Sequence, residues 1–229
     1  MTIANPAYSA NDEIVSFFTK TSATRLECDA RANELTGGKV VPIEVQGVCS
    51  YSVYAGPDLE YVVQFRLKSL ELKTQTSALA SKVYGSLAPS VSSEGEIGDE
   101  ASNKEPLYIY VMNRIKGLTY LDFILASGFP ENSQKVFAYR KNLVADIAKF
   151  FALSWNAPQS IDPAYRDQLH EKCVKELTLL HAALPDRFQP IIQKCIDFMD
   201  VILSLPMVLL HRDFGTCNIM VDEASCHST

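Results

Sequence analysis

Hydrophobic and polar positions follow different periods in the two halves of the chain. Over residues 39–66 and 107–112, apolar, β-branched and aromatic residues alternate with polar ones or run continuously, as they do in strands. Over residues 120–204, apolar residues instead recur every three or four positions, as they do in amphipathic helices. The pattern therefore predicts an N-terminal half built on a sheet and a C-terminal half built of helices.

The N-terminal half is predicted to be a small α+β unit. An antiparallel meander of three strands is expected, with Gly56, Pro57 and Asp58 as a tight turn before the third strand. A short strand is expected to begin at Val91, and the polar segment 92–106 is expected to be a hairpin loop without a fold of its own. The remaining expected elements are helices over residues 11–35 and 69–84 and a buried strand over residues 107–112.

The C-terminal half is predicted to contain three long helices. The longest is expected over residues 131–155, where Ala157 and Pro158 end the pattern. Two further helices are expected over residues 163–184 and 186–203, each after a proline.

Composition narrows the picture mainly by exclusion. The chain has 27 acidic and 21 basic residues and shows no basic stripe, so nucleic acid is not an expected partner. No apolar stretch reaches the length of a membrane span, and residues 1–6 do not resemble a secretory signal. The six cysteines form no C-x-x-C pair, which argues against a zinc finger or a disulfide framework. A cytoplasmic protein without membrane contact is therefore expected.

One polar loop between two apolar runs, each expected to be a short strand, carries candidate chemistry. Residues 211–218 spell H-R-D-x-x-x-x-N, the form of a phosphotransferase catalytic loop. In such a loop Asp213 accepts the proton of the attacking hydroxyl, Asn218 holds a metal ion, and His211 packs beneath to brace the loop. The alternative is a solvated turn with a buried, hydrogen-bonded histidine. The D-F-G spelling of residues 213–215 is coincidental, because that metal motif belongs after the catalytic loop.

The order of these parts predicts a fold. A five-strand region, a connector over residues 113–117, a helical region and then the H-R-D-x-x-x-x-N loop are in the protein-kinase-like order. The sequence resembles the aminoglycoside phosphotransferase and choline kinase-like family, and the resemblance rests on residues 61–66, 107–112, 115–117, 150–155 and 211–218. It implies an α+β two-lobe fold with an N-terminal helical extension (1–36), an antiparallel sheet lobe that binds nucleotide (37–112) and an incomplete helical lobe (113–229).

The resemblance also implies ATP and Mg²⁺ as cofactors and a small-molecule hydroxyl as acceptor. Asp213 would be the base with His211 as its support, and Asn218 would bind magnesium. The nucleotide would be held by Gly47 and Ser50 in the loop over residues 47–52, by Arg66 paired with Glu71, and by a hinge over residues 110–112 that includes Tyr110 and Met112. The alternative for the loop is a plain hairpin turn, and the alternative for the hinge is a core strand. Arg66 could instead be the surface end of a strand, and Lys68, on the same strand face, is the other candidate cation.

One departure from the family pattern bears on activity. The family places a second metal-binding Asp on the strand after the catalytic loop, whereas only eleven residues follow Asn218 and Asp222 comes too early. We therefore expect a truncated kinase-like chain whose own activity is doubtful. A non-catalytic fragment that binds nucleotide or a partner is the first alternative, and a helical interaction protein with a fortuitous loop is the second.

Overall fold

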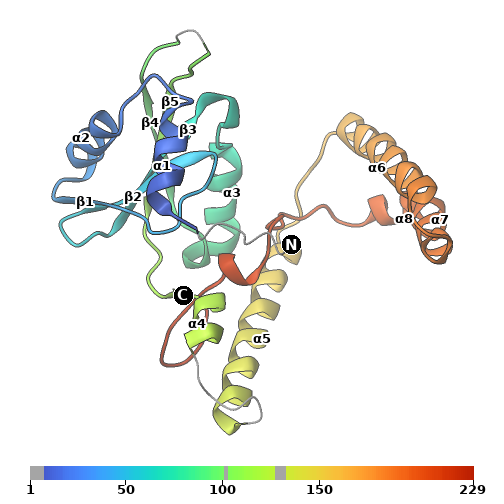
Figure 1. The fold of residues 1–229 in the computed structure, drawn as a ribbon. Coiled ribbons are helices and arrows are strands. Elements are labelled where there is room, and N and C mark those ends of the chain that lie inside the picture. The colour runs from blue at the N-terminus through green and yellow to red at the C-terminus, as the bar shows by residue number, and fades with distance from the viewer. Residues whose placement is uncertain (1–7, 101–102, 127–132) are drawn as a thin grey trace, which may run out of the picture. The chain divides into compact units, whose positions relative to one another are not determined.

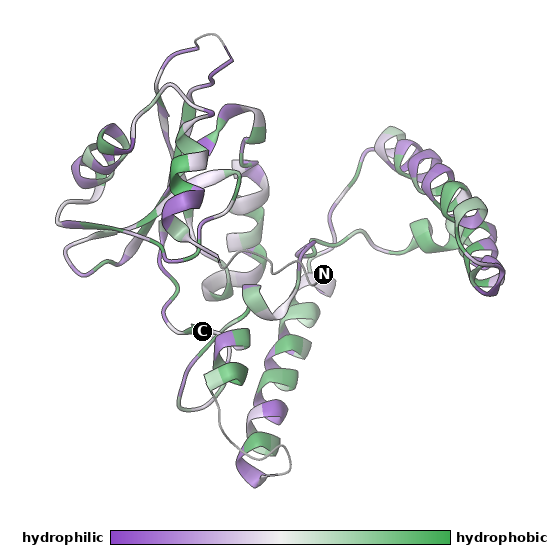
Figure 2. Ribbon diagram, in the orientation of Figure 1, coloured by the Kyte–Doolittle hydropathy of each residue, from purple (hydrophilic) through white to green (hydrophobic). Residues whose placement is uncertain are grey.

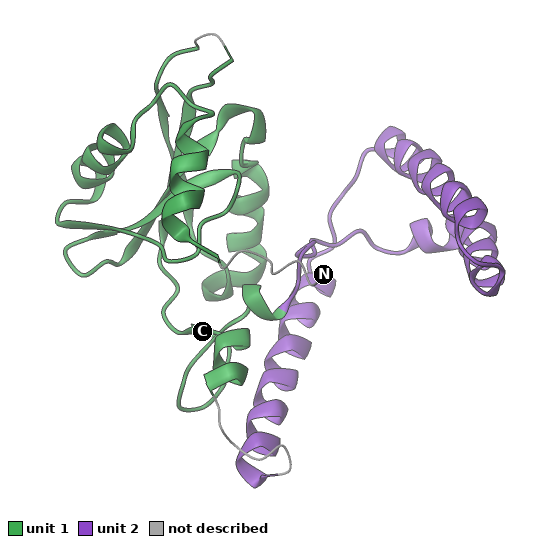
Figure 3. Cartoon of the chain, in the orientation of Figure 1, with its two compact units in different colours: residues 1–129, 216–229 green, residues 130–215 purple. Residues whose placement is uncertain are grey.

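The computed structural model describes residues 8–100, 103–126 and 133–229, which fall into two compact units. Unit 1 comprises Met1–Phe129 and Thr216–Thr229, and unit 2 comprises Pro130–Gly215 (Figures 1 and 3). Unit 1 is built on an antiparallel sheet and unit 2 is helical, so the predicted α+β fold is confirmed. Unit 1 includes the N-terminal helices, which pack on the sheet, and the last residues of the chain, which pair with residues 118–119.

The sheet of unit 1 has five strands in the order β1-β2-β3-β5-β4, and every neighbouring pair is antiparallel. The first three strands form the predicted meander, and β5 lies between β3 and β4. The strands are β1 (Lys39–Pro42), β2 (Ser50–Gly56), β3 (Tyr61–Leu67), β4 (Val91–Ile97) and β5 (Leu107–Asn113).

Strand β4 corrects the expectation of a loop that starts at residue 92. Its residues are polar, but β4 is an edge strand with most side chains exposed, so a polar sequence is tolerated there. The pairing with β5 shifts in register between Ser93 and Glu96. Gly95 lies inside this irregularity with a φ of 90°, a conformation that glycine adopts without steric cost.

The N-terminal segment forms two helices, α1 (Ala10–Phe18) and α2 (Arg25–Thr36), instead of the single helix expected over residues 11–35. Thr24 starts α2 anew through a capping box with Glu27, in which each side chain bonds the other residue's backbone N–H. Both helices cover one face of the sheet, where their buried residues form a core with strands β2, β3 and β5 (Figure 1). This core includes Ile14, Phe17, Cys28, Ala32, Tyr51, Val53, Val63, Phe65, Leu107 and Ile109.

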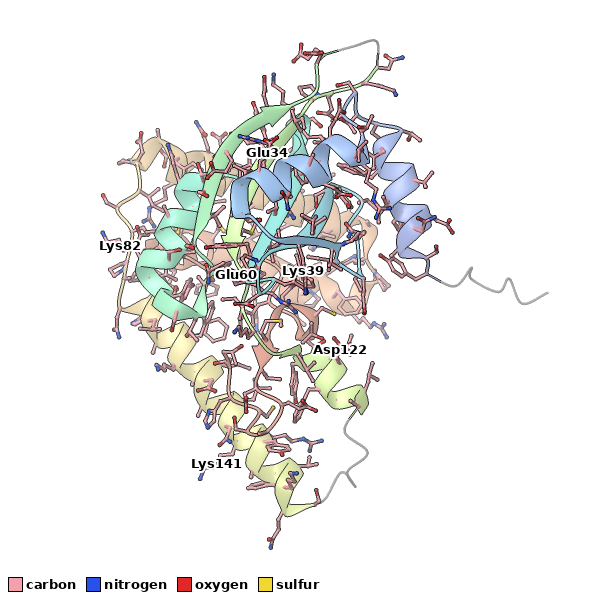
Figure 4. The ribbon with its side chains drawn as sticks, turned by 90° about the vertical axis from the view of Figure 1, so that its left-hand side faces the viewer. Glu34, Lys39, Glu60, Lys82, Asp122 and Lys141 are labelled. Atoms are coloured by element: carbon pink, nitrogen blue, oxygen red, sulfur yellow. The ribbon has the colours of Figure 1, made fainter. Side chains whose placement is uncertain are left out.

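The opposite face of the sheet adjoins helix α3 (Thr74–Tyr84), which starts later than expected because a 3-10 turn (Lys68–Leu70) and a short connection precede it. The Tyr110 hydroxyl accepts a 3.2 Å hydrogen bond from the backbone N–H of Leu72, which fixes this connection to β5. Figure 4 shows the charged side chains around the sheet, of which Glu34, Lys39 and Lys82 are exposed.

Unit 1 is completed by a small two-stranded sheet. Strand β6 (Leu118–Thr119) leads into helix α4 (Tyr120–Ala126), and β6 pairs antiparallel with β7 (Met220–Val221) from the end of the chain. The pairing brings together two segments about a hundred residues apart in sequence.

Unit 2 contains α5 (Gln134–Trp155), α6 (Pro163–Ala183), α7 (Gln189–Asp197) and α8 (Met199–Ser204). Ser133 caps α5, and the expected start at residue 131 lies outside the described residues. The single helix expected over residues 186–203 is divided at Phe198. Hydrophobic residues run along α5 and α8 (Figure 2), and no described helix is long and apolar enough to cross a membrane.

Candidate functional site

The first part of the candidate catalytic loop belongs to unit 2 and is attached to the end of α5. The expected strand before the loop is absent, because residues 206–210 have no regular structure. Two hydrogen bonds hold this segment instead. The buried Ser154 hydroxyl donates to the carbonyl of Leu209, and the backbone N–H of Gln159 donates to the carbonyl of Met207 over 2.7 Å.

Phe214 anchors the loop directly after Asp213. Its ring stacks on that of Phe150, with centroids 5.1 Å apart and an interplanar angle of 23°, and lies 5.3 Å from the ring of Phe151. The expectation that His211 packs beneath the loop is not met, because His211 is exposed; its ring meets that of Phe214 edge-on, with 6.4 Å between the centroids. The Phe214 ring packs on α5 in place of the His211 ring, since burying an imidazole requires a hydrogen-bond partner and burying a phenyl ring does not. Asp213 is exposed to solvent.

The second part of the loop belongs to unit 1. Asn218 ends a 3-10 turn (Thr216–Asn218) and is exposed, and strand β7 follows two residues later. The backbone N–H of Tyr120 donates to the carbonyl of Ile219 over 2.8 Å, next to the β6–β7 pairing. The position of Asn218 is therefore set by α4 and β6.

Asp222 is committed to a turn. Its Oδ1 accepts hydrogen bonds from the backbone N–H groups of Ala224 (3.1 Å) and Ser225 (2.9 Å) and from the Ser225 hydroxyl (2.8 Å). The bonds from Ser225 lower the pKa of this carboxyl, because they stabilise its charged form. These bonds give Asp222 a local structural role in the turn. Within the described ranges, no group of three or more His, Cys, Asp or Glu side chains is placed to hold a metal ion.

The sheet face opposite α1 and α2 brings two predicted nucleotide-binding residues together. Ser50 on β2 lies directly across from Arg66 on β3, and side chains on this face alternate with those of the core. Ser50 is only 5% exposed, and Arg66 is half-buried. The Arg66 Nη1 donates to Gln64 Oε1 over 3.2 Å, and its Nε donates to the carbonyl of Leu70.

Glu71 does not meet the expectation of a helix carboxylate. It lies in the connection before α3, is exposed, and forms none of the ion pairs found in the described part of unit 1. Lys68, the alternative to Arg66, lies in the 3-10 turn and pairs with Glu100 (3.1 Å) and Glu96 (3.8 Å). The bond to Glu100 and the charges of both carboxylates raise the pKa of Lys68. Lys68 is therefore engaged with two carboxylates, whereas Arg66 lies on the polar sheet face.

The expected hinge over residues 110–112 needs correction. β5 is an inner strand, so Tyr110 pairs with Gln64 on one side and Ser93 on the other, and Met112 is likewise paired on both sides. Main-chain groups used in two ladders are not available for an adenine ring. The first backbone beyond the ladder is the connector over residues 114–117, where the Arg114 guanidinium lies 3.7 Å from the centroid of the Tyr54 ring.

Three residues that sequence reasoning missed have clear roles in this geometry: Ser154, Phe214 and Gln64. The spacing of two between Gln64 and Arg66 would have placed both on one strand face. No comparable signal in the sequence pairs Phe214 with α5.

Comparisons with known proteins give similarities to solved structures but none to named families. No protein-family model matches the chain, and no curated protein matches it significantly. A solved structure of a point mutant of aminoglycoside 2′-phosphotransferase IIIa in its GDP complex is similar in structure, with 10% sequence identity and a TM-score of 0.42. The match covers 88% of this chain and 68% of that chain.

Proposed function

We propose that the chain derives from a phosphotransferase that moves the γ-phosphoryl group of ATP to the hydroxyl of a small molecule. The observation that carries this proposal is the spacing of Asp213 and Asn218 in a loop whose backbone is held on both sides, by α5 before it and by β6 after it. Asp213 would accept the hydroxyl proton as the oxygen attacks phosphorus and ADP leaves. Asn218 would bind Mg²⁺, which neutralises charge on the phosphates.

The nucleotide would lie on the polar face of the sheet in unit 1. Arg66 offers a permanent positive charge and a planar fork that suits phosphate oxygens, and Ser50 beside it offers a hydroxyl. The connector over residues 114–117 would contact the base. His211 would have a minor role in this scheme, because its side chain is exposed.

A second candidate function is nucleotide binding without turnover. It is favoured by the Asx turn of Asp222, whose Oδ1 already accepts three hydrogen bonds. Catalysis of phosphoryl transfer depends on charge neutralisation, so a site that holds the nucleotide without neutralising the transferred charge would bind far better than it reacts. The acceptor, the cytoplasmic location and the absence of a nucleic-acid partner remain predictions of the sequence.

Thermal unfolding with and without Mg·ATP tests both candidates. Nucleotide at a hundredfold excess over Kd should stabilise the fold by about 2.7 kcal/mol. This shift should need magnesium and should shrink in Asn218→Ala, but not in the control Asn11→Ala, which alters an exposed asparagine on α1. ADP release in the presence of small hydroxyl compounds then separates turnover from binding. Cooperative unfolding that nucleotide leaves unmoved would overturn both.

A further inference from the structure

The loop that joins β1 to β2, residues 43–49, is held by its own side chains and not by glycine. Gly47 is the one glycine in it, is exposed, and has no atom within 4 Å of the position where a Cβ would be. Its φ also lies outside the left-handed range, so an alanine would fit there equally well. Something other than glycine must therefore fix the path of this loop.

The side chain of Gln46 fixes it. Only 6% of Gln46 is exposed, and its amide forms three hydrogen bonds to backbone groups. Nε2 donates to the carbonyl of Ile43 (2.7 Å) and to the carbonyl of Ser52 (2.8 Å), and Oε1 accepts the N–H of Ser52 (2.9 Å). The amide thus pairs with Ser52 as a neighbouring strand would, using both its donor and its acceptor. The two bonds to Ser52 are buried, and the bond to Ile43 is partly buried.

The backbone of the loop is also attached to the N-terminal segment. The N–H of Gln46 donates to the hydroxyl of Tyr8 over 2.5 Å, and that hydroxyl lies 3.4 Å from the carbonyl of Gln46. Lys20 Nζ donates to the carbonyl of Val48 over 3.3 Å. The carbonyls of Gln46 and Val48 are therefore turned toward side chains of the N-terminal segment.

A chain of polar contacts continues from Ser52 to Arg66. The Ser52 hydroxyl accepts a hydrogen bond from Gln64 Nε2 at 3.4 Å, and Gln64 Oε1 accepts one from Arg66 Nη1 at 3.2 Å. Ser52 and Gln64 also lie directly opposite each other in the β2–β3 ladder. The loop and the arginine are thus connected through two paired residues of adjacent strands.

From this geometry we infer that Gln46 is a positioning residue for phosphate binding. Its buried amide holds the loop so that the loop's backbone and Arg66 act on the same phosphate groups of a nucleotide. The inference rests on the proposed function, because it requires a nucleotide on this face of the sheet. A purely structural role would affect every ligand of the site equally, whereas a positioning role affects only ligands that carry phosphates.

Two ligands and a matched pair of variants separate these roles. Gln46→Met keeps the length of the side chain and removes all three amide bonds. Its control is Asn33→Leu, which removes an amide that closes a backbone turn at Gly38, at the end of α2. Binding of Mg·ATP and of adenosine is measured by calorimetry for the unmodified chain and both variants. We expect Gln46→Met to weaken Mg·ATP by about tenfold, the equivalent of one or two net hydrogen bonds, and adenosine by less than about twofold. Asn33→Leu should change neither affinity.

Each other outcome is decisive. Equal weakening of both ligands by Gln46→Met, or unchanged affinity for Mg·ATP, would overturn the inference while the proposed function stands. Failure of the unmodified chain to bind either ligand would overturn the proposed function first. If Gln46→Met does not fold, Tyr8→Phe is tested in its place. It removes the hydroxyl that anchors the backbone of Gln46, and it does so at an exposed residue. It should weaken Mg·ATP more than adenosine, and an equal effect on both would again refute the inference.

Discussion

Replacing Gly117 by alanine should open the β6–β7 pairing that positions Asn218. Gly117 has a φ of 128°, and a Cβ there would lie 2.6 Å from the backbone carbonyl oxygen of Val221. The strained φ costs about 1–3 kcal/mol. The overlap adds about 1–3 kcal/mol more, because Val221 is fully buried and its backbone cannot retreat without breaking the pairing. The local free energy of opening should therefore fall by about 2–6 kcal/mol.

Native-state hydrogen exchange measures the free energy of opening at the β6–β7 sheet itself. The amide of Tyr120 bonds to Ile219 and that of Thr229 bonds to Met220, so both report opening of this small sheet. Their exchange should accelerate at least about tenfold in Gly117→Ala, since 1.4 kcal/mol corresponds to a factor of ten.

A second glycine separates strain from overlap. Gly85 has a φ of 58° but no atom within 4 Å of its Cβ position, and it lies at the end of α3. Gly85→Ala should leave the Tyr120 and Thr229 amides unchanged and should destabilise unit 1 by the strain alone. If the Tyr120 amide exchanges equally fast in Gly117→Ala and in the unmodified chain, the close approach at Val221 is not a constraint and the reasoning fails.

Two further predictions concern the loop and the chain end. Phe214→Leu removes the ring contacts with Phe150 and Phe151, so urea denaturation should show the free energy of unfolding of unit 2 lowered by about 1–3 kcal/mol. The control Phe137→Leu, at a position 73% exposed, should lower it by less than about 0.5 kcal/mol. Equal losses in the two variants would show that Phe214 does not anchor the loop. The Asx turn of Asp222 should be intact above the ordinary pKa of 3.8 and should be lost as the pH falls through the lower pKa of the folded chain, so the Ser225 amide proton should titrate in NMR with a midpoint below 3.8. A midpoint at or above 3.8 would show that the turn does not stabilise the carboxylate.

Local patterns predicted the sheet well, because strands that bury one face repeat with a period of two. Tyr51, Val53, Val63 and Phe65 alternate with polar residues, and the structure places these four in the core. Only the start of strand β4, at Val91, was expected, because an edge strand with exposed side chains carries no such pattern. Its pairing with β5 is a backbone interaction that composition does not reveal.

The candidate site was predicted in part, because motif spacing fixes which residues are near in sequence but not how the fold supports them. Ser50 and Arg66 are directly opposite in the ladder, as the nucleotide hypothesis requires. Phe214 takes the packed position that was expected for His211, because the aromatic rings of α5 contact it. The hinge was predicted within β5 because the sequence did not show that β4 pairs with the other edge of that strand.

The pairing of β6 with β7 makes unit 2 an insertion in the covalent chain of unit 1. Leu118 meets Val221 across it, so forming the small sheet closes a loop of about one hundred residues at an entropic cost of about 4 kcal/mol. During synthesis the five-stranded sheet can form early, because all of its strands precede residue 114. The small sheet cannot form until the whole helical insertion has been made. The segment with Asn218 is therefore the last part of unit 1 to fold, and any nucleotide site that needs it becomes competent only then.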